Sequence, residues 1–225
     1  MGRLASIEPK ETLSDRAYAI LKEAIVTNEL KPGELLVEGK LAEQMNISRT
    51  PIRTALKRLT MENLVLVKGK SIEVAGISFE EMQDIVQMRM MVEPEIFRRI
   101  QDDFTQKHLE SLRQIQHQSE YNIGNRQYRN YVDYDIQFHM FFINLLGNHY
   151  LSDYFRTLLT NYGRIAILSG TCKIYGESAS AEHDLLLDAL EQNDFELART
   201  QMQAHIRGIY ERYCVYWNME PEKNL

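Results

Sequence analysis

The sequence predicts a mainly α-helical protein with two parts: an N-terminal winged helix-turn-helix domain over residues 1–76 and a C-terminal all-α helical bundle over residues 77–225. Three observations support this prediction. Helical periodicity and two short β-prone runs follow one another in the first part, helical periodicity alone continues through the second, and the two parts carry net charges of opposite sign. A chain of 225 residues is also long enough for two modest domains.

Two helices and a turn are expected at the start of the first part. Residues 13–28 place apolar side chains at helical spacing, and Ser14 is the expected N-cap. Pro32 and Gly33 then indicate a turn, because proline fixes its own backbone angle and glycine accepts positive ones. A short second helix is expected over residues 38–45, where apolar side chains again recur at helical spacing.

A third helix and a hairpin complete the first part. The helix is expected over residues 49–62, with Ser48 as its N-cap and an apolar stripe along one side. Two β-prone runs follow, over residues 64–67 and 72–74, and they flank a turn that contains Gly69. The order helix, helix, turn, helix, hairpin is that of a winged helix-turn-helix.

The second part has helical signals only. It opens with Ser78 and Glu81, whose spacing is that of a capping box, and only a few residues link it to the first part. Helices joined by short connections are expected to pack as a bundle. The six helices are expected over residues 78–100, 105–121, 126–146, 151–169, 178–191 and 194–217.

The composition indicates a reducing compartment and no membrane span. Cys172 and Cys214 are the only cysteines, and their wide separation indicates neither a disulfide scaffold nor a thiolate zinc site. No apolar run approaches the roughly 20 residues that a membrane helix requires, and the N-terminus lacks the basic and then apolar order of a secretory signal. We therefore expect a cytoplasmic protein.

The net charge is distributed unevenly along the chain. The formal charge of the whole chain is -6, which by itself argues against a nucleic-acid partner. Residues 1–76, however, hold 12 Lys and Arg against 10 Asp and Glu, a net charge of +2, and the remainder holds 14 against 22, a net charge of -8. Residues 46–72 carry six basic residues against one glutamate, a net charge of +5. The positive charge therefore lies on the third helix and the hairpin.

The basic residues of this region are expected to contact DNA. Arg49, Arg53 and Lys57 are four residues apart and share one face of the third helix. A helix fits the major groove, where arginine binds guanine through two hydrogen bonds, and the hairpin lysines Lys68 and Lys70 would reach the backbone or the minor groove. The alternatives are a solvated cationic face and a winged domain that binds another protein.

Four residues of the second part have the side chains of a metal site. Asp135 and His139 are four residues apart and lie on one helical face, while His183 and His205 lie beside the apolar stripes of two other expected helices. Three imidazoles and one carboxylate inside a bundle would suit Zn, Ni, Mn or Fe, with positions left for water or an acidic ligand. Taken singly, each histidine is more often a structural residue.

Three short motifs occur in register in the first part: Leu-Lys-Pro-Gly at residues 30–33, Leu-Ala at residues 41–42, and Ser-Arg-Thr-Pro-Ile-Arg-x-Ala-Leu at residues 48–56. Together they resemble the N-terminal domain of the GntR family of bacterial transcription regulators. The resemblance implies that the partner is double-stranded operator DNA. The DNA-binding residues expected from the resemblance and the charge pattern are Ser48, Arg49, Thr50, Arg53, Lys57, Arg58, Lys68 and Gly69.

Three positions depart from the pattern of that family. Thr54 stands where the family usually has Glu, and Asn63 stands where a Gly commonly ends the helix. Gly39 stands where many members have an arginine that contacts the operator, and Lys40 replaces that arginine only in part. The resemblance therefore implies DNA binding without implying a particular operator sequence.

The second part contains Asp-x-x-x-His in one expected helix, Glu-His in a later one, and a further His in the last. This pattern resembles the FCD domain of the FadR-type branch of the GntR family, whose four metal ligands would here be Asp135, His139, His183 and His205. The six expected helices are closer to its shorter, VanR-like subgroup. The resemblance implies a divalent metal and, beside it, a pocket for a small organic acid.

Two arginines are candidates for binding the carboxylate of such an effector. Arg89 is the first, because a guanidinium pairs with a carboxylate through two hydrogen bonds, and Arg164 is the second. The alternative for Arg89 is an ion pair with Glu93, one helical turn further on.

Three functional hypotheses follow from these features. The first is a metabolite-responsive DNA-binding repressor that acts as a homodimer on a pseudo-palindromic operator, since a two-fold protein contacts two half-sites. The second is a metal-dependent enzyme in which Glu182 acts as the general base; however, the chain has no nucleophile elbow, phosphate loop or HExxH motif, and we expect no enzyme. The third keeps the regulator but makes the metal structural, or the effector itself.

Overall fold

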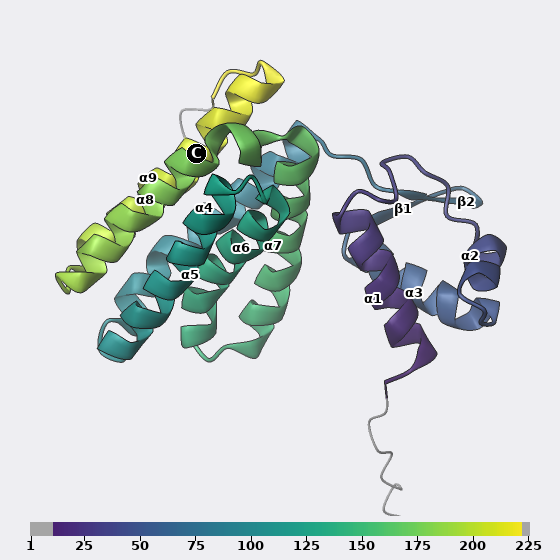
Figure 1. The fold of residues 1–225 in the computed structure, drawn as a ribbon, viewed down its shortest axis with the longest axis horizontal. Coiled ribbons are helices and arrows are strands. Elements are labelled where there is room, and N and C mark those ends of the chain that lie inside the picture. Colours follow the sequence, from purple (N-terminus) through teal and green to yellow (C-terminus); the bar gives the residue numbers. More distant parts are fainter. Residues whose placement is uncertain (1–10, 222–225) are drawn as a thin grey trace, which may run out of the picture. The chain divides into compact units, whose positions relative to one another are not determined.

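The computed structural model describes residues 11–221, which form two compact units that divide between Gly76 and Ile77 (Figure 1). The elements of the first unit are α1 (Leu13–Val26), α2 (Glu38–Gln44), α3 (Arg49–Met61), β1 (Val65–Lys68) and β2 (Ser71–Val74). Those of the second are α4 (Phe79–Ile100), α5 (Gln106–Gly124), α6 (Tyr128–Leu145), α7 (His149–Ser169), α8 (Thr171–Glu191) and α9 (Phe195–Trp217). The predicted fold class, a winged helix-turn-helix followed by a helical bundle, is confirmed.

The first helix begins at a different cap from the one expected. Thr12, rather than Ser14, is the N-cap of α1: its hydroxyl accepts a hydrogen bond from the backbone N–H of Asp15, and the Asp15 carboxylate accepts one from the backbone N–H of Thr12. This reciprocal pair is a capping box with Asp in place of Glu, and it satisfies backbone donors that a first helical turn leaves without partners. Ser14 lies inside that first turn.

The core of the first unit forms where α3 packs against α1, α2 and β1. Ile52, Ala55, Leu56 and Leu59 make up the buried side of α3, and each is at most 2% exposed. The apolar stripe expected on this helix is therefore confirmed. Because this side of α3 faces the core, the basic side chains on its other faces remain at the surface.

The hairpin is antiparallel, with Val65 opposite Val74, and its turn contains Gly69 at φ +61°, a region that glycine adopts without steric cost. A further segment joins this sheet, because Leu35 forms an isolated bridge with Glu73. That pairing was not expected, since one bridging residue leaves no alternating pattern in the sequence.

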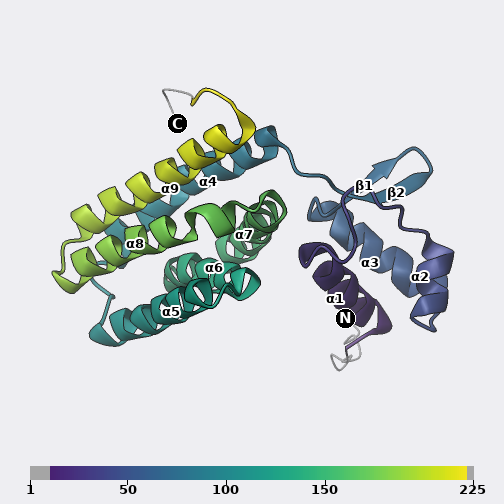
Figure 2. The same ribbon diagram turned by 45° about the horizontal axis from the view of Figure 1, so that its top comes forward.

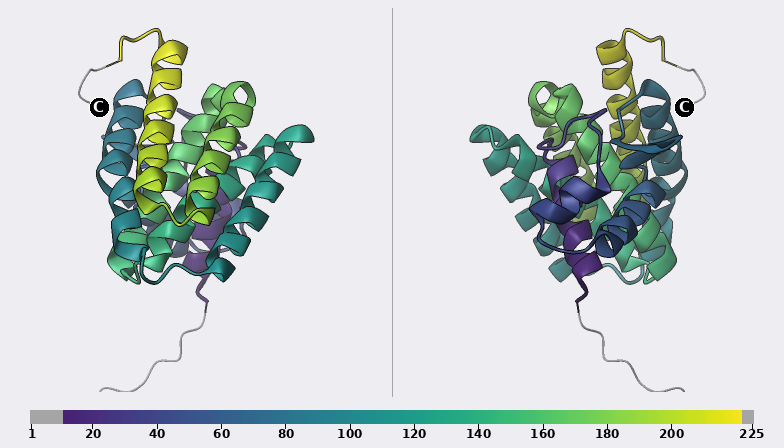
Figure 3. Two further views of the ribbon diagram at one scale, coloured as in Figure 1. Left: turned by 90° about the vertical axis from the view of Figure 1, so that its left-hand side faces the viewer. Right: turned by 90° about the vertical axis from the view of Figure 1, so that its right-hand side faces the viewer.

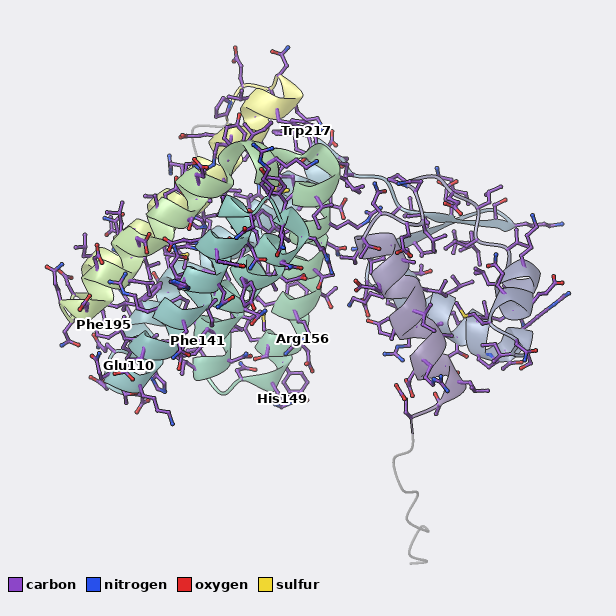
Figure 4. All side chains as sticks on the ribbon, viewed as in Figure 1. Glu110, Phe141, His149, Arg156, Phe195 and Trp217 are labelled. Atoms are coloured by element: carbon purple, nitrogen blue, oxygen red, sulfur yellow. The ribbon has the colours of Figure 1, made fainter. Side chains whose placement is uncertain are left out.

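In the second unit, α9 packs against α4 and α8, and α6 packs against α5 and α7 (Figures 2 and 3). Phe195 and Trp217 mark the two ends of α9, and both side chains pack against the bundle core (Figure 4). In addition, α8 packs against both α6 and α9. These three helices carry the four expected metal ligands.

The start of α8 corrects a predicted boundary. The helix begins at Thr171, not at residue 178, and Gly170 at φ +74° ends α7 directly before it. Gly176, inside α8, lies against Tyr131: a Cβ there would be 3.2 Å from the tyrosine ring. A glycine inside a helix costs about 1 kcal/mol relative to alanine, and in α8 it permits the close approach of this ring.

Candidate DNA-binding surface and metal centre

The exposed side of α3 and the hairpin carry most of the expected DNA contacts. Ser48 is the N-cap residue of α3, but its hydroxyl makes no capping hydrogen bond, so it remains free to contact a phosphate. The chain thus presents a helix N-terminus, a hydroxyl and several cations on one side. The members of the predicted set that are exposed are Ser48, Arg49, Thr50, Arg53, Lys57, Lys68 and Gly69.

Arg53 is held in place by a carboxylate of α2. Its Nε lies 3.0 Å from Oε1 of Glu38 and its Nη2 lies 2.8 Å from Oε2, so the pair is bidentate. The Arg53 side chain is nevertheless 59% exposed. The hydrogen bond from Arg53 lowers the pKa of Glu38. Glu38 thus orients the arginine toward solvent and adds a negative charge beside the expected DNA contacts.

Arg49 covers Gly39, one of the three positions that depart from the family pattern. A Cβ at Gly39 would be 3.4 Å from Nη2 of Arg49, so the space over this glycine is filled by the guanidinium of α3. An arginine at position 39 would compete with Arg49 for this space. The unusual glycine is therefore compatible with a contact surface in which Arg49 covers the N-terminal turn of α2.

Arg58 points away from these residues. Its Nη1 donates to Oδ1 of Asp15 at 2.7 Å, and its guanidinium carbon lies 3.8 Å from the centre of the Tyr18 ring, so it connects α3 to α1. Its position on α3 explains this direction, because Arg58 follows Lys57 by a single residue and lies about 100° further around the helix. We therefore leave Arg58 out of the proposed contact set.

The hairpin turn presents a second cationic position. Lys68 ends β1 and forms an ion pair with Glu73 of β2, and its side chain is 66% exposed. Gly69 follows in the turn and is exposed as well. An exposed lysine beside a glycine turn suits contact with a phosphate backbone, which requires charge but no particular base.

Replacing Glu38 by glutamine should strengthen binding to DNA of random sequence. We expect the affinity to rise about two- to tenfold, the size of effect expected when one charge contact with DNA changes. The reason is that the substitution removes one negative charge from a surface that meets phosphates. The preference for the operator over random DNA should fall, since Arg53 loses its bidentate support. Fluorescence anisotropy at several salt concentrations measures both, with Glu43→Gln in α2 as a control of equal charge change. An unchanged operator preference in Glu38→Gln would contradict a positioning role.

The three expected histidine ligands meet inside the bundle. His139 of α6, His183 of α8 and His205 of α9 are each 1% exposed, and one ring nitrogen of each lies within 4.8 Å of the others. Nε2 of His183 lies 3.3 Å from Nε2 of His205. The fourth expected ligand, Asp135, is also buried, with Oδ1 3.8 Å from Nε2 of His183. All four predicted metal ligands are thus neighbours.

Two glutamates that were not expected at this site orient the imidazoles. Oε2 of Glu93 lies 2.7 Å from Nδ1 of His139, and Oε2 of Glu182 lies 2.8 Å from Nδ1 of His205. A carboxylate accepts a hydrogen bond, so each contact assigns a proton to Nδ1 and leaves a lone pair on Nε2. Carboxylates in this role orient metal-binding imidazoles and make them more basic.

The donor set fits a divalent cation. Two nitrogens bound to one tetrahedral metal at the usual metal–nitrogen length are about 3.3 Å apart, close to the separation of the His183 and His205 nitrogens. Nδ1 of His183 is buried and has no hydrogen-bond partner among the described residues. A metal bound to Nε2 of His183 would offset the free-energy cost of burying this ring with an unpaired Nδ1.

The charges of the site favour the same ligand. Burial lowers the pKa of all three imidazoles, that of His205 to about 4, so the rings are neutral near pH 7 as metal binding requires. Burial also raises the pKa of Asp135, which means that a nearby cation would relieve the cost of its buried negative charge.

Arg89 forms the ion pair considered for it and also contacts His139. Its Nε lies 2.6 Å from Oε1 of Glu93, which is the expected ion pair one turn on, and its Nη2 lies 2.9 Å from Nε2 of His139. A metal on that nitrogen would replace the second contact. Nη1 of Arg89 is buried without a hydrogen-bond partner among the described residues, and the guanidinium lies 4.7 Å from the ring centre of Tyr162. An oxygen of a bound acid would satisfy this donor.

Arg164, the other effector candidate, is 2% exposed on α7. Its burial lowers its pKa, while the charge of Glu81, at the start of α4, raises it. The structure thus places Arg164 in the field of Glu81, and its role toward an effector stays a prediction.

A small cavity lies beside Asp135, between α6, α7, α8 and α9. It is lined by Tyr131, Tyr162 and Tyr213, by Cys172, and by Arg212 of α9. The sequence prediction missed Arg212, although a signal was available: it follows His205 by two helical turns and so shares its face of α9. Its guanidinium binds both oxygens of Glu182, at 2.6 and 2.9 Å.

Among residues 11–221, none of the helices combines the length and apolarity that crossing a bilayer requires.

Two family models match the chain. One described as the FCD domain matches residues 84–208, and one described as bacterial regulatory proteins of the gntR family matches residues 13–73. The HTH-type transcriptional repressor RspR of Escherichia coli K12 is 23% identical over 206 residues, which cover 91% of this chain and 90% of that protein. The gluconate operon transcriptional repressor of Bacillus licheniformis is 23% identical over 187 residues, which cover 81% and 77%.

Solved structures share the fold. A transcriptional regulator GntR from Rhodococcus sp. RHA1 superposes with a TM-score of 0.80 at 16% identity, over 92% of this chain and 99% of that one. McbR/YncC of E. coli superposes with a TM-score of 0.75 at 21% identity, over 92% and 100%.

Proposed function

Because the chain belongs to the GntR family of bacterial transcription regulators and carries an FCD domain, we propose that it is a metabolite-responsive repressor whose bundle binds a divalent metal and a small organic acid. It acts in the cytoplasm on operator DNA. The families and relatives that it matches are transcription regulators, so the chain is a regulator and not an enzyme. Glu182, the base of the enzymatic hypothesis, is held by Arg212 and His205.

The histidine cluster carries the effector part of this proposal. His139, His183 and His205 would hold the metal with Asp135, and the metal would supply a Lewis-acidic site for an oxygen of the acid. The unsatisfied Nη1 of Arg89 supports this arginine as the second partner of the acid, because the guanidinium can donate a hydrogen bond to the acid's carboxylate. Zn, Ni, Mn and Fe all accept such ligands.

The DNA part rests on the exposed face of α3 and the hairpin turn. Arg49 and Arg53 would contact base edges in the major groove, while Ser48, Thr50 and Lys57 would contact phosphates close by. The wing, with Lys68 and Gly69, would contact the DNA backbone. A homodimer would place two such surfaces on the half-sites of a pseudo-palindromic operator.

Anisotropy with a labelled fragment of the protein's own promoter region tests this proposal. We expect the promoter fragment to bind about 1,000-fold more tightly than random DNA of equal length, at the lower end of the usual range for specific binding, and the affinity to fall steeply with salt. Equal affinity for both DNAs would contradict the proposed function.

Metal analysis and ligand addition test the effector part. We expect about one divalent metal per chain, and gluconate, lactate or succinate should weaken promoter binding only in the metal-loaded protein. Gluconate is included because a relative is named for a gluconate operon. A metal that stabilises the fold while no acid alters DNA binding would favour a structural metal. A change in DNA binding caused by the metal alone would make the metal the effector.

A further inference from the structure

The cavity beside Asp135 is too small for an organic acid as it stands. Its volume is about 30 Å³, which is room for one or two water molecules. A three- to six-carbon acid can therefore enter only if a lining side chain moves. The identity of the side chain that moves determines what the ligand changes in the protein.

Arg212 is the lining side chain best placed to move. Tyr131, Tyr162 and Tyr213 are at most 8% exposed, and the hydroxyl of Tyr213 accepts a hydrogen bond from Thr171. The Arg212 side chain is 17% exposed, and it ends in an ion pair instead of a packed ring. A long, flexible side chain near the surface changes rotamer at a much lower cost than a ring buried in the core.

The partner that Arg212 would leave is also a partner of the metal site. Glu182 binds the Arg212 guanidinium through both oxygens, and its Oε2 lies 2.8 Å from Nδ1 of His205. Its Oε2 is therefore shared between Arg212 and the imidazole. When Arg212 leaves, the negative charge of this carboxylate is no longer shared with a guanidinium, so the hydrogen bond that His205 donates to it strengthens.

A glycine makes room for this ion pair. A Cβ at Gly208, one turn before Arg212 on α9, would lie 3.2 Å from Nη1 of Arg212 and 3.3 Å from Oε1 of Glu182. Glycine is otherwise unfavourable inside a helix by about 1 kcal/mol relative to alanine. Its presence at the crossing of α8 and α9 lets the two charged groups pack against the backbone.

We propose that the carboxylate of the effector replaces Glu182 on Arg212, and that the released Glu182 then binds His205 alone and tightens the grip of the site on its metal. Arg212 is thus the residue that connects the occupied cavity to the metal centre. This inference rests on the proposed function, because it needs both a metal and an acid. It assigns the effector class as small acids with a free carboxylate.

A double-mutant cycle on zinc affinity tests the connection without a ligand. The full-length wild type, Arg212→Ala, Glu182→Gln and the double variant are titrated with Zn²⁺ against a chromophoric chelator. Glu182→Gln should weaken zinc binding about 10- to 100-fold, the usual effect of losing a carboxylate behind a metal-bound histidine. Arg212→Ala should tighten it by a smaller factor, about threefold, because the carboxylate is kept and only its competing partner is lost, and should have little effect in the Glu182→Gln background.

Two matched controls accompany the cycle. Arg113→Ala, in α5, removes another arginine that pairs with carboxylates of the bundle, those of Asp184, Asp188 and Glu191, and should leave zinc affinity unchanged. Arg212→Lys replaces Arg212→Ala in the cycle if circular dichroism finds the alanine variant unfolded, since lysine keeps the charge but cannot form the bidentate pair.

Lactate, succinate and gluconate are then titrated into the zinc-loaded proteins. We expect at least one acid to bind the wild type, to tighten zinc binding about as much as Arg212→Ala does, and to bind Arg212→Ala at least tenfold more weakly. Additive effects of Arg212→Ala and Glu182→Gln, binding by none of the acids, or equal binding to wild type and Arg212→Ala would each overturn the inference. A wild type without any zinc affinity would contradict the metal centre of the proposed function itself.

Discussion

Arg53→Ala should lower the affinity for the operator about 5- to 150-fold, the range that corresponds to one bidentate contact between an arginine and a guanine. Arg53 is exposed and oriented by Glu38, so little of its conformational freedom remains to be lost when DNA binds. The affinity for random DNA should fall much less, because only a share of the phosphate attraction is removed. Anisotropy with both DNAs gives the two numbers.

The control for this substitution is Arg16→Ala, which removes an exposed arginine of α1 with the same change in charge. It should reduce operator affinity no more than random affinity. The unfolding of Arg53→Ala should match that of the wild type, since its ion pair is exposed and such pairs add about 0–1 kcal/mol to stability. An Arg53→Ala protein that keeps its full operator preference would show that α3 does not read bases through this residue.

Most of the fold was predictable because it depends on local patterns. The apolar stripe of α3 and the β-prone runs of the hairpin act over a few residues, and the structure has them at the expected places. The errors also have local causes. Thr12 replaced Ser14 as the cap because Asp15 completes a capping box only with Thr12. The start of α8 was placed at residue 178 instead of Thr171, because Gly170 alone separates α7 from α8 and no loop marks the boundary.

The candidate metal site was predictable in its ligands but not in their supports. Asp135 and His139 share one helical face, which spacing alone reveals. The pairing of Glu93 with His139, by contrast, depends on how α4 and α6 pack, and that of Glu182 with His205 depends on α8 and α9. Such contacts between distant segments leave no periodic trace in one sequence. Arg58 illustrates the same limit, since its partner Asp15 lies on α1.

The metal-free protein should lose stability as the pH falls from about 6.5 to about 4. Burial lowers the pKa of His205 from 6.5 to about 4 and shifts the pKa of His139 and His183 in the same direction. In this window the unfolded chain binds more protons than the folded one, so lowering the pH favours unfolding. His205 contributes a factor of about ten in the unfolding equilibrium constant per pH unit in this window, or about 3 kcal/mol over the whole shift, and His139 and His183 act in the same direction.

The single tryptophan makes this measurable. Trp217 stacks on Tyr213 and contacts Phe79 within the bundle, so its fluorescence during urea unfolding follows the second unit and not the first. Unfolding is measured between pH 7 and pH 4 with chelator, and again with saturating Zn²⁺. Zinc should raise stability most near pH 7 and lose its effect as protons displace it from the imidazoles.

A variant separates the buried rings from the other groups that titrate in this range. His205→Gln should flatten the pH dependence by one imidazole and remove most of the zinc effect, whereas His117→Gln, on the exposed side of α5, should change neither. The glutamates add a second phase: Glu93 and Glu182, whose pKa is about 2 because of their cationic partners, stabilise the fold above pH 4.5 and lose this contribution as the pH falls to about 2. An equal pH dependence in the wild type and in His205→Gln would contradict a neutral, buried His205, since Asp135, whose pKa is raised by burial and which stabilises the fold as the pH falls, is present in both proteins.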